Sequence, residues 1–497
     1  MRASGILMPV FSLPSRYGIG SFSKSAYQFV DMLKKAGQKY WQILPLCPTS
    51  YGDSPYQSFS TYAGNPYFID LDQLIEEKLL TRKECQACDF GDDPQDIDYG
   101  KLYENRFKLL RKAYERANVG EDQEFEAYRR ENAWWLDDYA LFMAVKDQFD
   151  GVAWNEWAED IRLRWSNAMD YYRRELYYEI EFYSYLQFVF MKQWKKLKNY
   201  ANINGIEIIG DIPIYVAFDS ADAWANPELF QFDAENLPTA VAGCPPDGFS
   251  ADGQLWGNPL YRWDYHRETG FDWWIRRIAY CSELYDVVRI DHFRGFDEYY
   301  SIPYGDTTAR NGHWEKGPGI ALFEAAKNRL GELNIIAEDL GYITDSVKKL
   351  VADSGFPGMK VLEFAFDSRE KSDYLPYTYE KNSVVYTGTH DNETIAGWYA
   401  GLDKSDLKMC TDYMNIDRIP GKEYHWDFIR LAMLSVSDLC VIPIQDYLGL
   451  DNRARINHPS TLGTNWRWRL AKDQLSASLL KEIREMTRIS GRLQNGE

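Results

Sequence analysis

The chain has 497 residues, 45% of them hydrophobic, so it can bury a large core as two to four ordinary domains or as one barrel with large insertions. Its 56 basic and 75 acidic residues give a formal net charge of −19, which disfavours nucleic acid or an anionic membrane surface as a partner. The sequence has neither the roughly 20 consecutive apolar residues of a membrane span nor a recognisable secretory signal at residues 6–11, so we expect a soluble cytoplasmic protein.

Eight short apolar runs, many rich in β-branched residues, follow one another along the chain, and each ends in polar residues or a Gly/Pro-rich turn. Several are continuously apolar, which is typical of parallel strands that are buried on both faces. Amphipathic or irregular stretches separate them, so the pattern predicts the α/β class and a (β/α)₈ TIM barrel. The predicted strands are residues 6–11, 40–46, 206–216, 287–291, 335–338, 359–364, 384–389 and 440–445.

Two long interruptions separate predicted strands. Residues from about 70 to 200 show apolar side chains at helical spacing, which predicts a mostly helical insertion. Residues from about 218 to 280 are rich in Gly, Pro, Asp and Trp with little periodicity, which predicts an irregular insertion of the kind in which barrel enzymes build substrate sites. We therefore expect one catalytic barrel over residues 1–497 that carries two inserted subdomains.

The cysteine and aromatic contents limit the kinds of site and substrate that the sequence favours. Seven scattered cysteines argue against a disulfide framework, and Cys85 and Cys88 form a single C-x-x-C without the second pair of a typical metal site. Aromatic residues make up 16% of the chain, and their rings can stack on the C–H faces of sugars, although packing alone accounts for most of them. The composition favours a neutral polar substrate such as carbohydrate.

Three acidic residues come where predicted barrel strands end: Asp291 after the fourth, Glu338 after the fifth and Asp391 after the seventh. All three are expected to meet at the carboxyl-terminal rim, where barrel active sites lie. Retaining cleavage of a glycosidic bond needs a carboxylate nucleophile and a protonated carboxyl about 5–5.5 Å apart. We assign Asp291 as nucleophile, Glu338 as general acid and base, and Asp391 as the group that stabilises the transition state.

Basic and imidazole side chains accompany these carboxylates. His292 and His390, two of only six histidines, adjoin Asp291 and Asp391, and Arg289 shares a strand face with Asp291. Neutral histidines can bind sugar hydroxyls, and a nearby cation lowers the pKa of a carboxyl. Structural roles for these side chains stay open, as does a metal site of Asp, Glu and His ligands, although paired-His spacing is missing.

The segments around the three carboxylates resemble the signature regions of amylomaltase, the family of 4-α-glucanotransferases or disproportionating enzymes within the wider α-amylase superfamily. The resemblance covers essentially the whole chain. It includes Gly52-Asp53-Ser54-Pro55-Tyr56-Gln57-Ser58, Gly210-Asp211-Ile212-Pro213-Ile214-Tyr215-Val216, Pro245-Pro246-Asp247, Trp256-Gly257-Asn258-Pro259-Leu260-Tyr261 and Asn465-Trp466.

The resemblance implies transfer of α-1,4-glucan segments by a retaining double displacement, without a metal or other cofactor. The implied partners are malto-oligosaccharides, amylose and glucans derived from starch or glycogen, bound by a monomer or a weak homo-oligomer. The implied substrate contacts are Tyr56, Asp211, Arg289, His292 and His390, with Asp247 and Trp256 on a mobile covering loop and Tyr51 at a secondary glucan site. The alternatives are an α-glucan hydrolase with the same carboxylates and a non-catalytic glucan-binding protein.

Overall fold

The computed structural model describes residues 2–50, 52–246, 250–341, 343–416 and 424–494. Eight parallel strands close into a barrel in the order β1-β12-β11-β10-β9-β6-β3-β2, which confirms the predicted (β/α)₈ fold. The barrel strands are β1 (Ala3–Leu7), β2 (Tyr40–Gln42), β3 (Glu207–Pro213), β6 (Val287–Asp291), β9 (Ile335–Ala337), β10 (Gly358–Val361), β11 (Ser383–Tyr386) and β12 (Leu439–Pro443).

The strand bounds differ most from the prediction at the start of the chain. The first strand ends at Leu7, and Val10–Ser12 form a short 3₁₀ helix instead of continuing the predicted strand over residues 6–11. Pro9 precedes this helix at φ −60° and has no N–H to donate to a neighbouring strand, so the ladder stops there. The continuous hydrophobicity of residues 6–11 identified a strand there but could not show where its pairing with the neighbouring strands ends.

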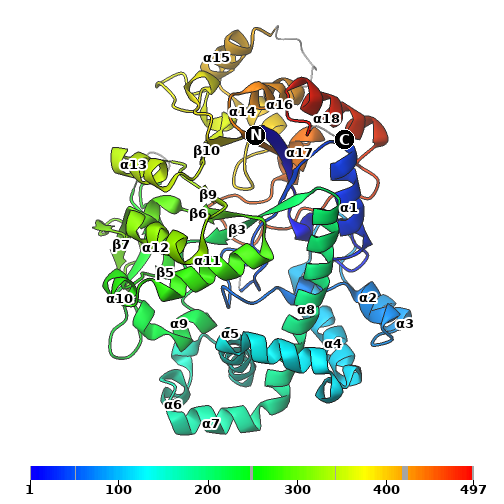
Figure 1. Cartoon of the computed structure of the whole chain (residues 1–497), viewed down its shortest axis with the longest axis vertical. Coiled ribbons are helices and arrows are strands. Elements are labelled where there is room, and N and C mark those ends of the chain that lie inside the picture. The colour runs from blue at the N-terminus through cyan, green and yellow to red at the C-terminus, as the bar shows by residue number, and fades with distance from the viewer. Residues whose placement is uncertain (1, 51, 247–249, 342, 417–423, 495–497) are drawn as a thin grey trace.

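Helices cover the outside of the barrel. In Figure 1, α1 and α18 lie on one side of it, and α11, α12 and α13 on the other. Near the chain ends, Arg492 Nη1 donates to the Ala3 carbonyl at 2.9 Å, so the segment that follows α18 is tied to the first strand. These outer helices are α1 (Lys24–Lys35), α11 (Asp272–Leu284), α12 (Ile320–Leu330), α13 (Asp345–Ser354), α14 (Ile395–Gly401), α15 (Lys404–Met414), α16 (His425–Leu434), α17 (Ile444–Tyr447) and α18 (Ala477–Ile489).

The interruption between the second and third barrel strands contains a group of helices, as the helical periodicity predicts. Figure 1 shows them extending away from the barrel, with α8 running from this lobe back toward β3. They are α2 (Leu71–Glu76), α3 (Arg82–Gln86), α4 (Tyr99–Ala117), α5 (Gln123–Gln148), α6 (Glu159–Arg162), α7 (Ser166–Glu175) and α8 (Tyr177–Ile203). In the part of the chain that is described, none of the helices is long and apolar enough to cross a membrane.

The region from about 218 to 280 holds more regular structure than the prediction of an irregular insertion. It contains α9 (Ala221–Ala225), β4 (Ala240–Cys244), β5 (Gln254–Pro259), α10 (Trp263–Glu268) and most of α11. β4 and β5 join β7 (Glu298–Pro303) and β8 (His313–Lys316) in an antiparallel sheet of order β5-β4-β7-β8. The small residues of β4 give almost no strand signal, and its partner β7 lies beyond β6 in the chain, so local patterns missed this sheet.

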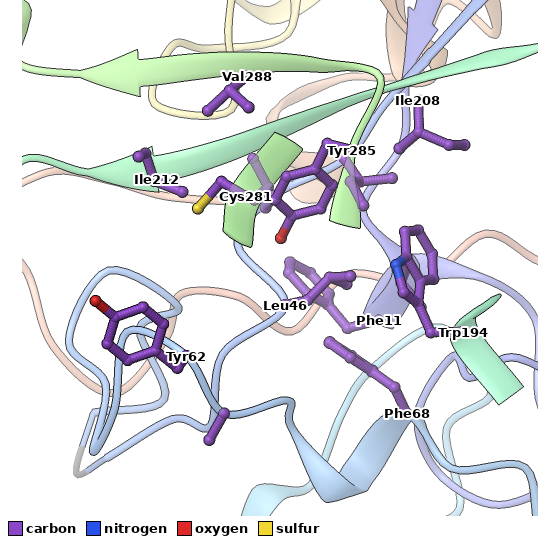
Figure 2. Packing of buried hydrophobic residues seen from close by; sticks show 14 of the residues in the cluster. Phe11, Leu46, Tyr62, Phe68, Trp194, Ile208, Ile212, Cys281, Tyr285 and Val288 are labelled. Carbon is purple, nitrogen blue, oxygen red and sulfur yellow. The ribbon is translucent and has the colours of Figure 1, made fainter. Parts of the chain in front are cut away.

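Large apolar side chains fill the space between the barrel and its helices. Figure 2 shows Phe11, Phe68, Trp194 and Tyr285 in this layer, and Trp194 Nε1 donates to the Leu284 carbonyl at 3.1 Å. Gly210 on β3 lets the Tyr285 ring approach, because a Cβ there would lie 2.1 Å from Tyr285 Cγ. A separate cluster has members from six of the barrel strands: Leu7, Ile209, Ile336, Met359, Val361, Val384, Tyr386 and Val441.

Candidate active site

A cavity of about 500 Å³ opens where the barrel strands end. Aromatic rings form much of its wall, and the carboxylates of Asp291 and Asp391 face into it. The carboxyl-terminal end of the strands is where barrel enzymes place their chemistry. Its lining includes Tyr56, Gln57, Pro213, Tyr215, Trp256, Asn258, Asp291, His292, Asp391, Asn457 and Trp466.

A buried guanidinium joins two of the predicted site carboxylates. Arg289 Nη1 donates to Asp211 Oδ1 and Oδ2 at 2.8 and 2.7 Å, and it lies 3.0 Å from Asp291 Oδ1. Tyr56 Oη adds a 2.7 Å hydrogen bond to Asp211 Oδ2. The register of β3 with β6 pairs Asp211 directly with Arg289, and alternation places Asp291 on the same strand face as Arg289.

Burial and pairing act in opposite directions on Asp291. Burial raises the pKa of its carboxyl well above the ordinary value, and the nearby Glu338 carboxyl adds to this rise. Arg289 lowers the same pKa, because a cation at 3.0 Å stabilises the carboxylate. The ionised form of Asp291 therefore depends on Arg289.

Glu338 lies beside Asp291 through the barrel register. Ile290 on β6 pairs with Ala337 on β9, so the residues that follow, Asp291 and Glu338, end neighbouring strands. Glu338 Oε2 accepts from the His292 backbone N–H at 2.6 Å and Oε1 from the Leu340 N–H at 2.9 Å. Burial raises the pKa of Glu338, while Arg289 and these two hydrogen bonds lower it.

The backbone of His292 has a left-handed conformation, with φ 53° and ψ 46°. Non-glycine residues seldom adopt this region, and such outliers cluster at functional sites. Here the turn immediately after Asp291 directs the His292 N–H at Glu338 and places the imidazole in the cavity wall. The His292 ring meets Trp256 edge to face, with centroids 4.8 Å apart.

Asp391 lies on the opposite side of the cavity, in the loop after β11. Its Oδ1 accepts a 2.6 Å hydrogen bond from Asn457 Nδ2 and lies 3.3 Å from His390 Nε2. The His390 ring stacks on Tyr56, with centroids 5.2 Å apart and planes at 13°. The Asp391 side chain is still 42% exposed, so its carboxylate can reach a ligand in the cavity.

Both site histidines are neutral at neutral pH. Burial lowers the pKa of His292 to about 3, with Arg294 adding to the effect. Burial also lowers the pKa of His390, although Asp391 opposes the change. Neutral imidazoles can exchange hydrogen bonds with sugar hydroxyls without adding a charge to the site.

The structure brings nine of the predicted site residues together: Tyr56, Asp211, Trp256, Arg289, Asp291, His292, Glu338, His390 and Asp391. Tyr51 and Asp247 lie outside the described residues. Sequence reasoning did not single out Asn457, although its position shortly after the last barrel strand was a usable signal. Within the described ranges, no group of three or more His, Cys, Asp or Glu side chains is arranged to hold a metal ion.

Acidic side chains that end neighbouring strands of a closed parallel barrel, beneath an aromatic-walled cavity, define a carboxylate-based barrel enzyme of the kind that acts on glycosidic bonds. The sequence comparison makes this class specific, because the family model described as 4-alpha-glucanotransferase matches residues 8–475. The chain belongs to this family of enzymes. The match confirms the amylomaltase resemblance and the predicted transferase activity.

Individual relatives agree with the family. The chain is 50% identical to a 4-alpha-glucanotransferase of Streptococcus pneumoniae over 99% of its own length and 98% of the relative. It is 49% identical to a 4-alpha-glucanotransferase of Clostridium butyricum over 98% of this chain and 100% of that one. Among solved structures, amylomaltase from Streptococcus agalactiae in complex with acarbose has a TM-score of 0.96 and 44% identity, over 99% of this chain and 100% of that chain.

Replacing the buried guanidinium tests its electrostatic role. We expect Arg289→Met to cost about 3–5 kcal/mol of unfolding free energy, because Asp211 and Asp291 keep their burial and lose their cation. The matched control is Arg369→Met, since Arg369 pairs with Asp367 on the surface with 77% of its side chain exposed; solvent screens such a pair, so we expect no measurable loss of stability. Urea unfolding followed by tryptophan fluorescence measures both, and equal losses would contradict the assigned role.

Proposed function

We propose that this chain transfers α-1,4-glucan segments from a malto-oligosaccharide donor to the 4-hydroxyl of glucose or another glucan, with retention of configuration. The observation that carries the proposal is the register that ends neighbouring strands at Asp291 and Glu338. Adjacent strands lie about 4.8 Å apart, which matches the separation of about 5–5.5 Å between the carboxyls of retaining enzymes. Inverting enzymes need a wider gap for a water molecule.

The first chemical step breaks the donor. Glu338 gives its proton to the glycosidic oxygen while an Asp291 carboxylate oxygen bonds to the anomeric carbon, and the bond between that carbon and the leaving oxygen breaks. The released glucan keeps the proton. Asp291 now carries the remaining segment as a glycosyl ester, and Glu338 is a carboxylate.

The second step reverses these roles. Glu338 accepts a proton from the acceptor 4-hydroxyl, whose oxygen bonds to the anomeric carbon as the ester bond to Asp291 breaks. The hydrogen bonds from the His292 and Leu340 N–H groups stabilise the Glu338 carboxylate of this step. Its burial favours the protonated form needed for the first step, so the site supports both states.

Asp391 and the two histidines are placed to contact the sugar at the reacting centre. Positive charge develops on the anomeric carbon and ring oxygen, and the Asp391 carboxylate, oriented by Asn457, faces the same cavity. His292, packed against Trp256, and His390, stacked on Tyr56, supply neutral hydrogen-bonding groups.

Transfer rather than hydrolysis is supported by the family and by an aromatic part of the cavity wall. Trp256 and Tyr215 line this wall, with centroids 6.3 Å apart, and aromatic faces can hold an acceptor sugar in place of water. The likeness to an amylomaltase bound to acarbose supports an oligosaccharide as the occupant. Asp247 of the predicted covering loop is included in this proposal only because it belongs to the Pro245-Pro246-Asp247 motif.

Product analysis tests the proposed reaction. With maltotriose alone, we expect chains longer than three glucose units together with shorter products, because the segment on Asp291 passes to another sugar. Asp291→Asn should lower the rate by at least about 10³-fold through loss of the nucleophile. Chromatography of the products separates the outcomes: only shorter sugars would show a hydrolase, and unchanged transfer by the variant would remove Asp291 from the mechanism. The exposed Asp353→Asn is the matched control, with native activity expected.

The pH dependence should change with the leaving group. With maltotriose, kcat/KM is expected to fall as pH rises, because Glu338 loses the proton it must donate, and to fall as pH drops, because Asp291 gains one. With maltosyl fluoride, whose leaving group needs no proton, only the acidic fall should remain. Rates from about pH 4 to 9 measure this, and an identical alkaline fall with both donors would contradict the assignment of Glu338. His292, with a pKa of about 3, should add no further fall in that range.

A further inference from the structure

One buried carboxyl outside the cavity holds both ends of the loop that carries His390 and Asp391. This loop leaves β11 at Thr387 and enters α14 at Ile395. Thr387 Oγ1 donates to Asp446 Oδ2, and the Ile395 backbone N–H donates to Asp446 Oδ1 at 2.8 Å. Asp446 follows the last barrel strand, in α17, and is only 1% exposed.

The middle of the same loop is held by the segment that follows α17. Arg455 Nη2 donates to the Asp391 carbonyl at 2.7 Å, and the Asn457 N–H donates to the His390 carbonyl at 3.1 Å. This segment leaves Asp446 through a turn in which the Asp446 carbonyl accepts from the Gly449 N–H at 3.1 Å. Asp446 therefore lies where the loop and the segment that orients Asp391 are joined.

The start of the loop is also held by the neighbouring strand. The Glu363 backbone N–H, just after β10, donates to the Thr387 carbonyl at 3.2 Å. Gly388 lets the loop pass close to the Glu363 side chain, because a Cβ there would lie 2.6 Å from Glu363 Oε1. Thr387 is therefore held through its carbonyl as well as through its hydroxyl.

We propose that Asp446 is a positioning residue for the transfer reaction, which acts through Asp391 and His390 by fixing both ends of their loop to the barrel. The proposal rests on the proposed function, since it needs Asp391 to act on the transition state. Asp446 is not among the residues that line the cavity, so its effect requires no contact with the sugar. A misplacement of about 1 Å in a catalytic group can cost about 10²-fold in rate.

The change Asp446→Asn tests this with little change in volume. Asparagine has one acceptor oxygen, so if that oxygen keeps the Ile395 bond its NH2 group faces Thr387, whose hydroxyl must turn from donor to acceptor for a bond to remain. We expect kcat with maltotriose to fall about 10²-fold, with KM changed less than about threefold, because the loss falls on the transition state. Thr387→Val removes one donor at nearly constant shape and should lower kcat about tenfold; it also serves if Asp446→Asn does not fold.

Asp70→Asn is the matched control for burial. Asp70 is 3% exposed and also accepts two hydrogen bonds, in its case both from backbone N–H groups at 3.3 Å, but at the start of α2. We expect its kcat to stay within about twofold of native, whatever its melting temperature. A similar fall of kcat in Asp70→Asn and Asp446→Asn would show a general loss of folded enzyme and overturn the proposal.

A double-mutant cycle decides whether Asp446 acts through Asp391. The rate of fluoride release from maltosyl fluoride is measured for native enzyme, Asp446→Asn, Asp391→Asn and the double variant. We expect Asp446→Asn to cost less than about threefold in the Asp391→Asn background, because the group it positions is already lost. The full loss in both backgrounds, or native kcat in Asp446→Asn, would overturn the proposal. Native enzyme that releases fluoride but never lengthens maltotriose would instead contradict the proposed transfer function.

Discussion

The site depends on one buried cation. Arg289 contacts Asp211 and Asp291 on neighbouring strands, and Tyr56 completes the hydrogen bonding of Asp211. An isolated charge at 2% exposure would be costly, so the guanidinium and its carboxylates have to be buried together. Asp211 accepts two hydrogen bonds from the Arg289 guanidinium, so Arg289 engages only one oxygen of Asp291. Asp291 can therefore face the cavity and still act on a substrate.

Parallel strand register supplies most of the remaining geometry. It pairs Asp211 with Arg289 across β3 and β6, and it ends β6 and β9 with Asp291 and Glu338 side by side. The loops after β11 and β12 then add Asp391 and Asn457 from the opposite side of the opening. A rigid barrel thus holds the reacting groups, while Trp256 on β5 of the small antiparallel sheet contributes part of the wall.

Sequence patterns predicted the barrel and its three carboxylates because both depend on local signals. A strand buried on both faces is recognisable as an apolar run, and an acidic residue where such a run ends stands out. The β5-β4-β7-β8 sheet was missed because β4 is made of small residues and pairs with β7 across β6. The left-handed turn at His292 and the bonds from Asp446 to Thr387 and Ile395 depend on tertiary contacts, which spacing along the chain does not show.

In the proposed double displacement, Asp291 becomes covalently attached to the glucan, and this glycosyl ester can be trapped. A 5-fluoro-maltosyl fluoride should accumulate the ester, because the ring fluorine slows both steps while the good fluoride leaving group speeds only the first. Digestion and mass spectrometry of the treated enzyme should find one added glycosyl unit on the peptide that contains Asp291. A label on Glu338 or Asp391, or turnover of the reagent with inversion and without any attached sugar, would show that Asp291 is not the nucleophile.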